Sequence, residues 1–168
     1  MAYTVASFTD PTSGVRVITA DLTRAANETA YTAVDVIGDT NVAASISLTG
    51  AGLSNGGGGR IAAVQLLGSK TAGDLQFDLA LFRSAPTTAA DNAVFAGTYA
   101  QMLDLIAAVP VTTAKNMGAN GTLYVSSGLD IPFICADGTT TIYGVLIARS
   151  AYTPASAETM RLTILIKR

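Results

Sequence analysis

Large apolar residues occupy every second position in two segments of this chain, and this period of two constrains the fold more than any other feature. In residues 75–81 the apolar positions are Leu75, Phe77, Leu79 and Leu81. In residues 160–167 they are Met160, Leu162, Ile164 and Ile166. Successive side chains of an extended strand point to opposite faces of a sheet. Both segments are therefore predicted to be strands that bury one face in a core.

Seven further segments are rich in β-branched residues and are predicted to be strands: 15–22, 42–48, 60–67, 105–111, 122–126, 131–135 and 140–148. Turn-forming residues separate them at 10–11, 54–56, 73–74, 120–121, 137–138 and 153–154. Helical periodicity is nearly absent, although residues 98–104 fit one or two helical turns. The pattern predicts an all-β fold, an antiparallel two-sheet sandwich that is jelly-roll-like with about eight to ten strands; a barrel is the alternative.

The domain organisation is predicted to be simple. A chain of 168 residues fits one domain, and we find no internal repeat, linker or heptad pattern. Residues 13–168 are assigned to a single β-sandwich domain. Residues 1–12 are less patterned and are assigned to an N-terminal arm. An arm that orders only on a neighbouring subunit and a frayed chain end both fit that stretch.

Charge is scarce in this chain. Charged residues make up 13% of the sequence, against about 25% in an average globular protein. The net charge of −2 and the scattered Lys and Arg residues argue against nucleic-acid binding. Apolar runs such as 105–111 are far shorter than the roughly 20 residues that span a bilayer, so no membrane association is expected. Low surface charge also favours association between subunits.

The sequence holds no histidine, which removes the usual general base near neutral pH and the commonest zinc ligand. Glu28 and Glu158 are the only glutamates, and most of the aspartates adjoin Gly, Pro or a predicted strand end. Aspartate is common there because it hydrogen-bonds nearby backbone. A glycosidase built on two carboxylates stays formally open, but the absence of tryptophan disfavours a sugar-binding cleft. We therefore expect that the protein is not an enzyme.

Three short sequence features are weaker indications of a ligand site. The glycine run 56–59 before Arg60 lacks the Lys-Ser or Lys-Thr of a phosphate-binding loop, so a flexible or hairpin connection is expected. Asp35 and Asp39 could share a calcium ion, but the EF-hand spacing is missing and turn positions suit both. Cys135 has no basic neighbour and is expected to be a small buried apolar residue. No cofactor and no metal is predicted.

Five segments together resemble a known group of proteins: 35–38 (DVIG), 59–64 (GRIAAV), 75–86 (LQFDLALFRSAP), 91–95 (DNAVF) and 129–133 (LDIPF). Their order is similar to that of small jelly-roll-like virion structural proteins of tailed bacteriophages, over roughly residues 30–166. These motifs are patterns of apolar and turn residues, not catalytic signatures. The resemblance implies a head decoration, or cement, protein, often trimeric on the capsid lattice.

The expected function is therefore a phage capsid decoration protein that binds the assembled head and stabilises it through protein–protein contacts. Its expected partners are the major capsid protein and itself, as a homotrimer. Its expected location is the capsid surface of the virion, after synthesis in the host cytoplasm, because a lone cysteine and the lack of a signal-peptide pattern fit a reducing compartment. The alternatives are a carbohydrate-binding or host-recognition module on a tail or fibre, and a neck or baseplate subunit.

Contact residues are predicted on segments that carry little charge and lie outside the alternating strands. These segments are the N-terminal arm, the glycine-rich loop before residue 60 and the connection 85–99. The predicted partner-binding residues are Tyr3, Val5, Phe8, Asn55, Arg60, Asn92, Phe95 and Tyr99.

Overall fold

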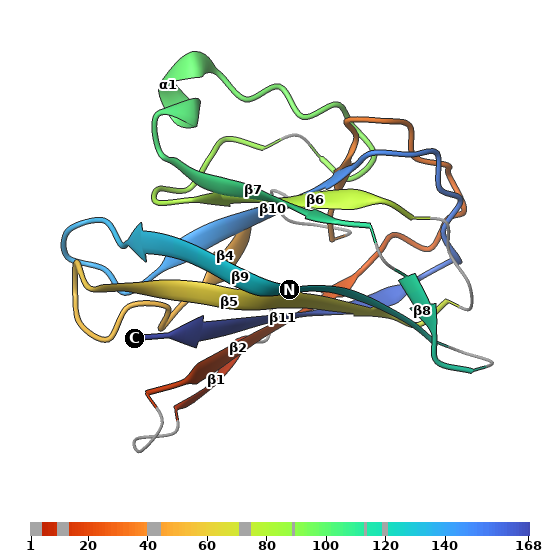
Figure 1. Ribbon diagram of the computed structural model, residues 1–168. Coiled ribbons are helices and arrows are strands. Elements are labelled where there is room, and N and C mark those ends of the chain that lie inside the picture. The colour runs from red at the N-terminus through yellow and green to blue at the C-terminus, as the bar shows by residue number, and fades with distance from the viewer. Residues whose placement is uncertain are drawn as a thin grey trace.

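The computed structural model of this protein describes residues 14–39, 45–70, 75–88, 90–112, 114–118 and 121–168, together with the backbone of residues 5–9. These residues form eleven strands and one short helix (Figure 1). The elements are β1 (Val5–Thr9), β2 (Arg16–Thr23), β3 (Val36–Ile37), β4 (Ile46–Leu48), β5 (Gly58–Gly68), β6 (Phe77–Phe82), α1 (Tyr99–Met102), β7 (Leu105–Val111), β8 (Ala114–Asn116), β9 (Thr122–Ile134), β10 (Ile142–Ala148) and β11 (Thr159–Lys167).

The strands form two antiparallel sheets that pack face to face. The larger sheet has six strands in the order β1-β2-β11-β5-β9-β8. The smaller sheet has five, in the order β3-β10-β6-β7, with β4 also paired to β10. The central strands of the larger sheet, β2-β11-β5-β9, therefore face the strands β3-β10-β6-β7 of the smaller sheet. Along the chain, the strands of the smaller sheet fall between strands of the larger one. This is the strand order of a jelly roll, so the predicted fold class is confirmed.

The main core lies between the two sheets. In β11 the residues Met160, Leu162, Ile164 and Ile166 are buried while their neighbours are exposed or half-buried, as the alternation predicts. Residues Phe77, Leu79 and Leu81 of β6 contribute to the same core from the opposite sheet. Cys135 is also buried there, at 1% exposure, and burial raises the pKa of its thiol. The expectation of a small buried apolar cysteine is confirmed.

The long strand β9 corrects one sequence-based expectation. Residues 122–126 and 131–135 were predicted as two strands, but the structure joins them into a single strand that pairs with β5 along its length. The register shifts where Ile61 pairs with Ile131 and Ala63 pairs with Ser127, which leaves residues 128–130 of β9 opposite one residue of β5. Gly128 lies in this bulge with a φ of +72°, a conformation that glycine adopts at no steric cost.

Three strands have no counterpart in the sequence-based prediction. β3 and β8 have two and three residues, too few for a periodic pattern to emerge. β1 comprises residues 5–9 of the predicted N-terminal arm and pairs with β2 at the edge of the larger sheet. That part of the arm is therefore a sheet strand. Residues 1–4 and 10–12 lie outside the described residues, and ordering on a neighbouring subunit stays a prediction.

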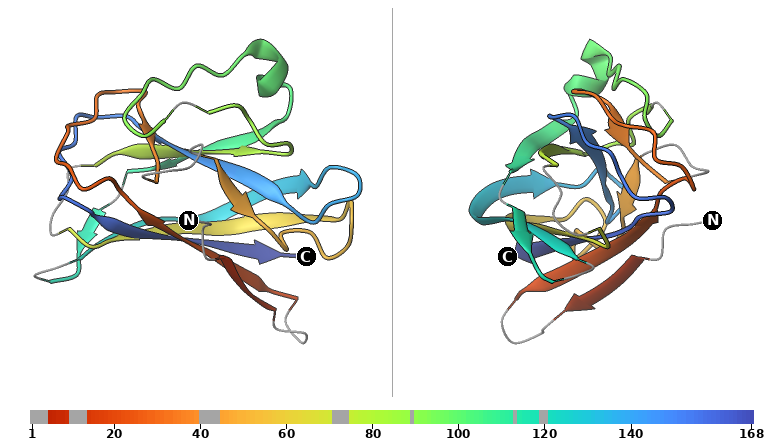
Figure 2. Two further views of the ribbon diagram at one scale, coloured as in Figure 1. Left: turned by 180° about the vertical axis from the view of Figure 1, so that it is seen from behind. Right: turned by 90° about the vertical axis from the view of Figure 1, so that its right-hand side faces the viewer.

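The outer face of the smaller sheet is covered by the chain itself. The connection from β6 to β7, which we call the covering segment (residues 83–88 and 90–104), runs back over this sheet and carries α1 at its far end (Figures 1 and 2). Beneath it lies a second apolar cluster of Val36, Ala80, Phe82, Val145 and Ile147. The smaller sheet is therefore buried on both faces, which explains why β10 is buried at six of its seven positions.

Candidate interaction surface

The covering segment is fixed to the smaller sheet by backbone hydrogen bonds. The amide of Asn92 donates to the carbonyl of Val36 at 2.9 Å, and the amide of Val36 donates to the carbonyl of Ala93 at 2.9 Å. The amide of Phe95 donates to the carbonyl of Val34, also at 2.9 Å. Asn92 has a φ of +60°, a left-handed conformation that asparagine tolerates better than most residues. The segment thus extends the sheet beyond β3.

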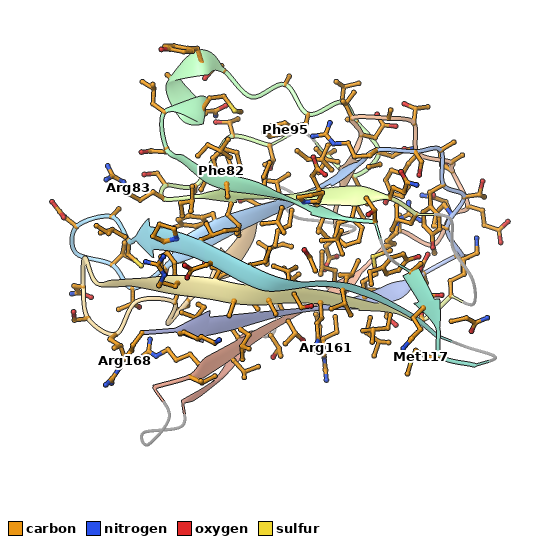
Figure 3. The ribbon with its side chains drawn as sticks, in the orientation of Figure 1. Phe82, Arg83, Phe95, Met117, Arg161 and Arg168 are labelled. Carbon is orange, nitrogen blue, oxygen red and sulfur yellow. The ribbon has the colours of Figure 1, made fainter. Side chains whose placement is uncertain are left out.

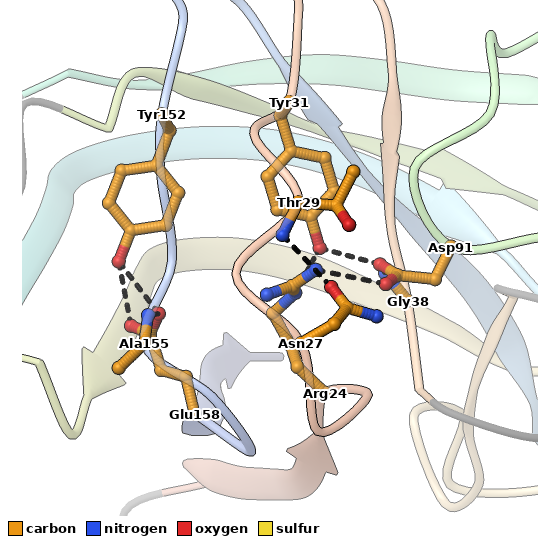
Figure 4. Close-up of polar contacts among 9 residues, drawn as sticks. All are labelled: Arg24, Asn27, Thr29, Tyr31, Gly38, Asp91, Tyr152, Ala155 and Glu158. Carbon is orange, nitrogen blue, oxygen red and sulfur yellow. Dashed lines mark hydrogen bonds and ion pairs between the residues drawn. The ribbon is translucent and has the colours of Figure 1, made fainter.

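A buried polar cluster holds the start of this turn (Figure 4). The Asp91 carboxylate accepts hydrogen bonds from the Tyr31 hydroxyl at 2.5 Å and from the amide of Gly38 at 2.9 Å. Its other oxygen lies 3.1 Å from the guanidinium of Arg24, whose side chain is fully buried. Arg24 also donates to the Tyr31 hydroxyl and stacks 4.5 Å from the Tyr31 ring centroid. Arg24 and Tyr31 of the β2–β3 connection and Gly38 after β3 thus meet Asp91, which lies 53 to 67 positions later in the chain.

A second cluster lies beside the first. The Tyr152 hydroxyl donates to the Glu158 carboxylate at 2.8 Å, and the amide of Ala155 donates to the same carboxylate at 3.2 Å. The rings of Tyr31 and Tyr152 stack with their centroids 6.4 Å apart. Burial, together with the neighbouring carboxylates, raises the pKa of both tyrosines well above their usual value near 10. Both hydroxyls therefore stay protonated and act as hydrogen-bond donors that join the loops.

Helix α1 projects from the far end of the covering segment. Thr98 caps it, because its Oγ1 accepts from the amide of Gln101 at 3.4 Å while the Gln101 side chain accepts from the amide of Thr98 at 2.9 Å. None of the four helical residues is buried. Tyr99 is 82% exposed and the C-cap residue Leu103 is 71% exposed. The helix is thus locally stabilised and presents apolar side chains to solvent.

Exposed apolar side chains gather around α1. Six of the nine large apolar side chains that are exposed in the described part of the chain belong to this region, and we call them the cap surface: Val34, Val94, Tyr99, Leu103, Leu105 and Ile134. Two neighbouring hollows share Leu105. One, of about 180 Å³, is lined almost wholly by apolar side chains that include Phe82, Phe95 and Met102. The other, of about 450 Å³, lies between Leu103 and Ile134.

The cap surface carries little free charge. Arg83 lies beside Asp104 at 3.6 Å, and Arg149 forms an ion pair with Asp78 at 2.6 Å. Each arginine near the hollows is therefore matched by a carboxylate of this chain. Figure 3 shows Phe82, Arg83 and Phe95 on this side of the molecule, and Met117, Arg161 and Arg168 on the opposite side. Clustered apolar side chains of this kind are typical of surfaces that bind other proteins.

The structure brings together three of the predicted contact residues and separates the others. Asn92, Phe95 and Tyr99 all belong to the covering segment, with the Phe95 ring 6.3 Å from that of Phe82 and half-buried. Asn55 is exposed on the loop before β5. The backbone of Val5 and Phe8 lies in β1, opposite Ala20 and Val17. Tyr3 lies outside the described residues.

Arg60 lies on β5 of the larger sheet, where its register partner Pro132 lines the hollow between Leu103 and Ile134. Its guanidinium forms a two-point ion pair with Asp130, with one N–O distance of 2.6 Å, and this pairing lowers the pKa of Asp130. The glycine run before it is a turn that leads into β5, since Gly58 and Gly59 are already strand residues. A Cβ at Gly58 would lie 2.2 Å from the Phe133 carbonyl oxygen, which explains the glycine by close backbone approach.

Asp35, one of the two carboxylates considered as calcium ligands, has local structural partners. Asp35 accepts hydrogen bonds from the amide and hydroxyl of Thr32 at 2.5 and 2.9 Å, which is the turn role expected of aspartate. Within the described ranges, no group of three or more Asp, Glu or Cys side chains is arranged to hold a metal ion. No described helix is long and apolar enough to cross a membrane.

Several residues of this surface were missed by sequence reasoning. Val34, Leu103 and Leu105 were not singled out, because isolated apolar residues in a connection look like ordinary loop or strand residues. Arg24 gave no signal at all, since nothing in a sequence marks an arginine as buried. Asp91 was noted only as part of a resemblance. Comparison of the chain with protein-family models, with curated proteins and with solved structures finds no match.

Proposed function

We propose that this protein is a structural protein of a tailed-bacteriophage virion, a capsid decoration protein that binds the assembled head and stabilises it. The proposed partner is the major capsid protein, and the proposed bound form is a homotrimer on the capsid surface. The protein would be made in the host cytoplasm. The proposal rests on the jelly-roll fold, on the resemblance described above and on the cap surface.

The cap surface is the observation that carries this proposal. Tyr99, Leu103 and Val94 are 82%, 71% and 56% exposed, yet they belong to a segment anchored by the buried Asp91 cluster. An ordered apolar surface loses little conformational entropy on binding, so more of its burial energy is available for affinity. Paired charges at its border favour an uncharged partner surface over an ionic one.

The physical logic of capsid stabilisation requires no active site. A protein that binds only the assembled, expanded head shifts the equilibrium toward that state by mass action. Many equivalent copies repeat the same modest contact over the lattice, and a trimer engages several neighbouring capsid subunits at once. Low net charge suits this role because copies then lie near one another without strong repulsion.

Co-sedimentation with phage heads tests the proposal. Purified protein is mixed with expanded heads that lack decoration and with unexpanded heads, and the pelleted fraction is measured. We expect saturable binding to expanded heads. The Leu103→Ser variant should bind roughly ten-fold more weakly, because the exposed leucine is a predicted anchor. Met117→Ser is the matched control, since Met117 is 58% exposed but lies away from the cap surface, and it should bind normally.

Failure of the wild-type protein to pellet with any head preparation would refute capsid binding. Equal weakening by both variants would remove the cap surface as the contact. Reproducible binding on a glycan array, with no binding to heads, would instead support the host-recognition alternative.

A further inference from the structure

The outer face of the larger sheet is uncharged at its centre. Thr163 of β11 lies between Thr19 of β2 and Gln65 of β5. One step along the strands, Leu165 lies between Val17 and Ala63. These side chains alternate with the buried ones, so they all project from the outer side. All except the exposed Gln65 are half-buried, and Figures 1 and 2 show no described element lying over them.

Charges on this face stand toward its ends, and the two arginines there are paired within the chain. At one end Arg161 makes two hydrogen bonds to Asp21, at 2.6 and 2.7 Å. At the other end Arg60 makes its ion pair with Asp130. Lys115 and Lys167 also lie toward these ends, in β8 and at the end of β11. An uncharged centre framed by charged and polar residues is the usual anatomy of a protein–protein interface.

We propose that a second copy of this chain docks on this face, so that the two six-stranded sheets pack against each other about a two-fold axis. Strands lie about 4.8 Å apart and rise about 3.3 Å per residue, so the 49 residues of the six strands offer roughly 780 Å². A stable interface buries about 800 Å² on each partner. The face is therefore of the size that a stable pair requires, and a hollow of about 500 Å³ lined by Asp21, Leu67 and Arg161 lies at one end of it.

The charge pattern favours a second copy over a partner with a charged surface. A two-fold contact places each surface against its own equivalent, so an uncharged centre meets an uncharged centre. The Arg161–Asp21 and Arg60–Asp130 pairs are already neutralised, so neither leaves an unmatched charge at the border. Threonine, valine and glutamine side chains on twisted sheets pack well when two sheets align about 10 Å apart.

The pairing is independent of the proposed capsid contact. Five of the six cap-surface residues belong to the β2–β3 connection, the covering segment and β7, on the side of the smaller sheet, and Ile134 lies at the end of β9, outside the uncharged centre of the larger sheet. A two-fold contact yields an even number of chains. It combines with a three-fold ring only as six chains, two trimers joined face to face. The assembly is therefore predicted to contain two or six chains.

Mass measurement of the free protein tests this pairing. Light scattering after size exclusion should give two or six times the chain mass of 17.1 kDa. Gln65→Glu and Gln65→Lys each place like charges near the two-fold axis, and each should halve the mass and weaken pairing roughly 100-fold. Mixing these two variants should restore the wild-type mass. Gln76→Glu, an exposed glutamine beside the smaller sheet, is the matched control and should leave the mass unchanged.

A wild-type mass of one or three chains would overturn the two-fold pairing. It would not bear on the capsid proposal, which the co-sedimentation experiment tests separately. The same conclusion would follow if both Gln65 variants kept the wild-type mass. Circular dichroism of each variant checks that the sandwich is intact, so a lost pair is not confused with a lost fold. Binding to expanded heads, measured on the Gln65 variants, separates the two proposals.

Discussion

The outer faces of the two sheets differ in composition and in whether the chain covers them. The smaller sheet carries Phe82, Val145 and Ile147 on its outer side, and the chain covers them with its own covering segment. The larger sheet carries threonines, a glutamine and smaller apolar residues there, and no described segment covers them. A strongly apolar sheet face must be covered during folding, whereas a mixed face tolerates water until a partner arrives.

The strand sequences reflect this difference. β11 alternates cleanly between buried and outward positions, while β10 and the end of β6 are buried at successive positions. Continuous apolar runs are typical of strands covered on both faces. The outer face of the smaller sheet is therefore buried by the chain's own covering segment, whereas the outer face of the larger sheet is open to association. The predictions below test that difference, from the largest effect to the smallest.

Phe82→Ala should produce the largest loss of stability. The side chain is fully buried beneath the covering segment, so its removal leaves a cavity and should lower the free energy of unfolding by about 3–5 kcal/mol. Leu67→Ala, at an outward position of β5 where the side chain is 46% exposed, is the control and should cost about 1 kcal/mol or less. Urea denaturation measures both. Equal losses for the two variants would mean that the two outer faces do not differ in burial.

Asp91→Ala should rank second and act on the same segment. It leaves the buried guanidinium of Arg24 without its carboxylate, a change that typically costs about 3 kcal/mol. Hydrogen exchange should speed up at the amides of Asn92 and Phe95, which pair with the sheet, while β11 amides stay protected until global unfolding. Unchanged exchange at those two amides would show that Asp91 does not anchor the covering segment.

Alkaline pH should weaken the protein through its two buried tyrosines. Burial raises the folded-state pKa of Tyr31 and Tyr152 above the unfolded value near 10, so the folded state holds its protons where the unfolded state releases them. Their stabilising contribution is complete below pH 10 and is lost above it, by about 1.4 kcal/mol per pH unit for each tyrosine. Denaturation between pH 9 and 11 should therefore show a steeper loss for wild type than for Tyr152→Phe. Parallel pH profiles for the two proteins would contradict this assignment.

The smallest expected effect is the loss of stability at acidic pH that comes from the Asp21–Arg161 ion pair on the open face. The hydrogen bond from Arg161 lowers the pKa of Asp21 below its unfolded value, so the contribution of this pair is present above pH 4 and is lost as pH falls through the folded pKa. The pair is exposed to solvent, and its effect on the free energy of unfolding should be slight and salt-sensitive. Asp21→Asn should shift the acid limb of the stability profile only marginally. A large shift would indicate that this border is more buried than the free chain shows.

Periodicity predicted the parts of the fold that depend on one-sided burial. The alternation in residues 160–167 identified β11 and its buried face, because a strand that is buried on one face only has apolar residues at every second position. The same logic split β9 in two, because the Gly128 bulge interrupts the alternation while the strand continues. The strand continues past the bulge because its backbone stays paired with β5 on both sides, and backbone pairing leaves no pattern in the side chains.

The candidate surface was predicted only in part. Phe95 and Tyr99 were selected because they lie in an uncharged connection, and the structure places both on the covering segment. Arg60 was selected on the same grounds, but its ion pair with Asp130 depends on a pairing between β5 and β9 that the sequence does not encode locally. Arg24 and Tyr31 lie in the β2–β3 connection and Asp91 lies 60 residues beyond Tyr31, so their cluster is visible only once the chain is folded.

Localisation of the protein on whole phage particles tests the central claim most directly. Labelled antibody against this protein, viewed by electron microscopy, should decorate the entire head surface at regular lattice positions. Label confined to the neck, the baseplate or the tail fibres, or absent from particles altogether, would contradict the account of this sandwich as a capsid-binding protein.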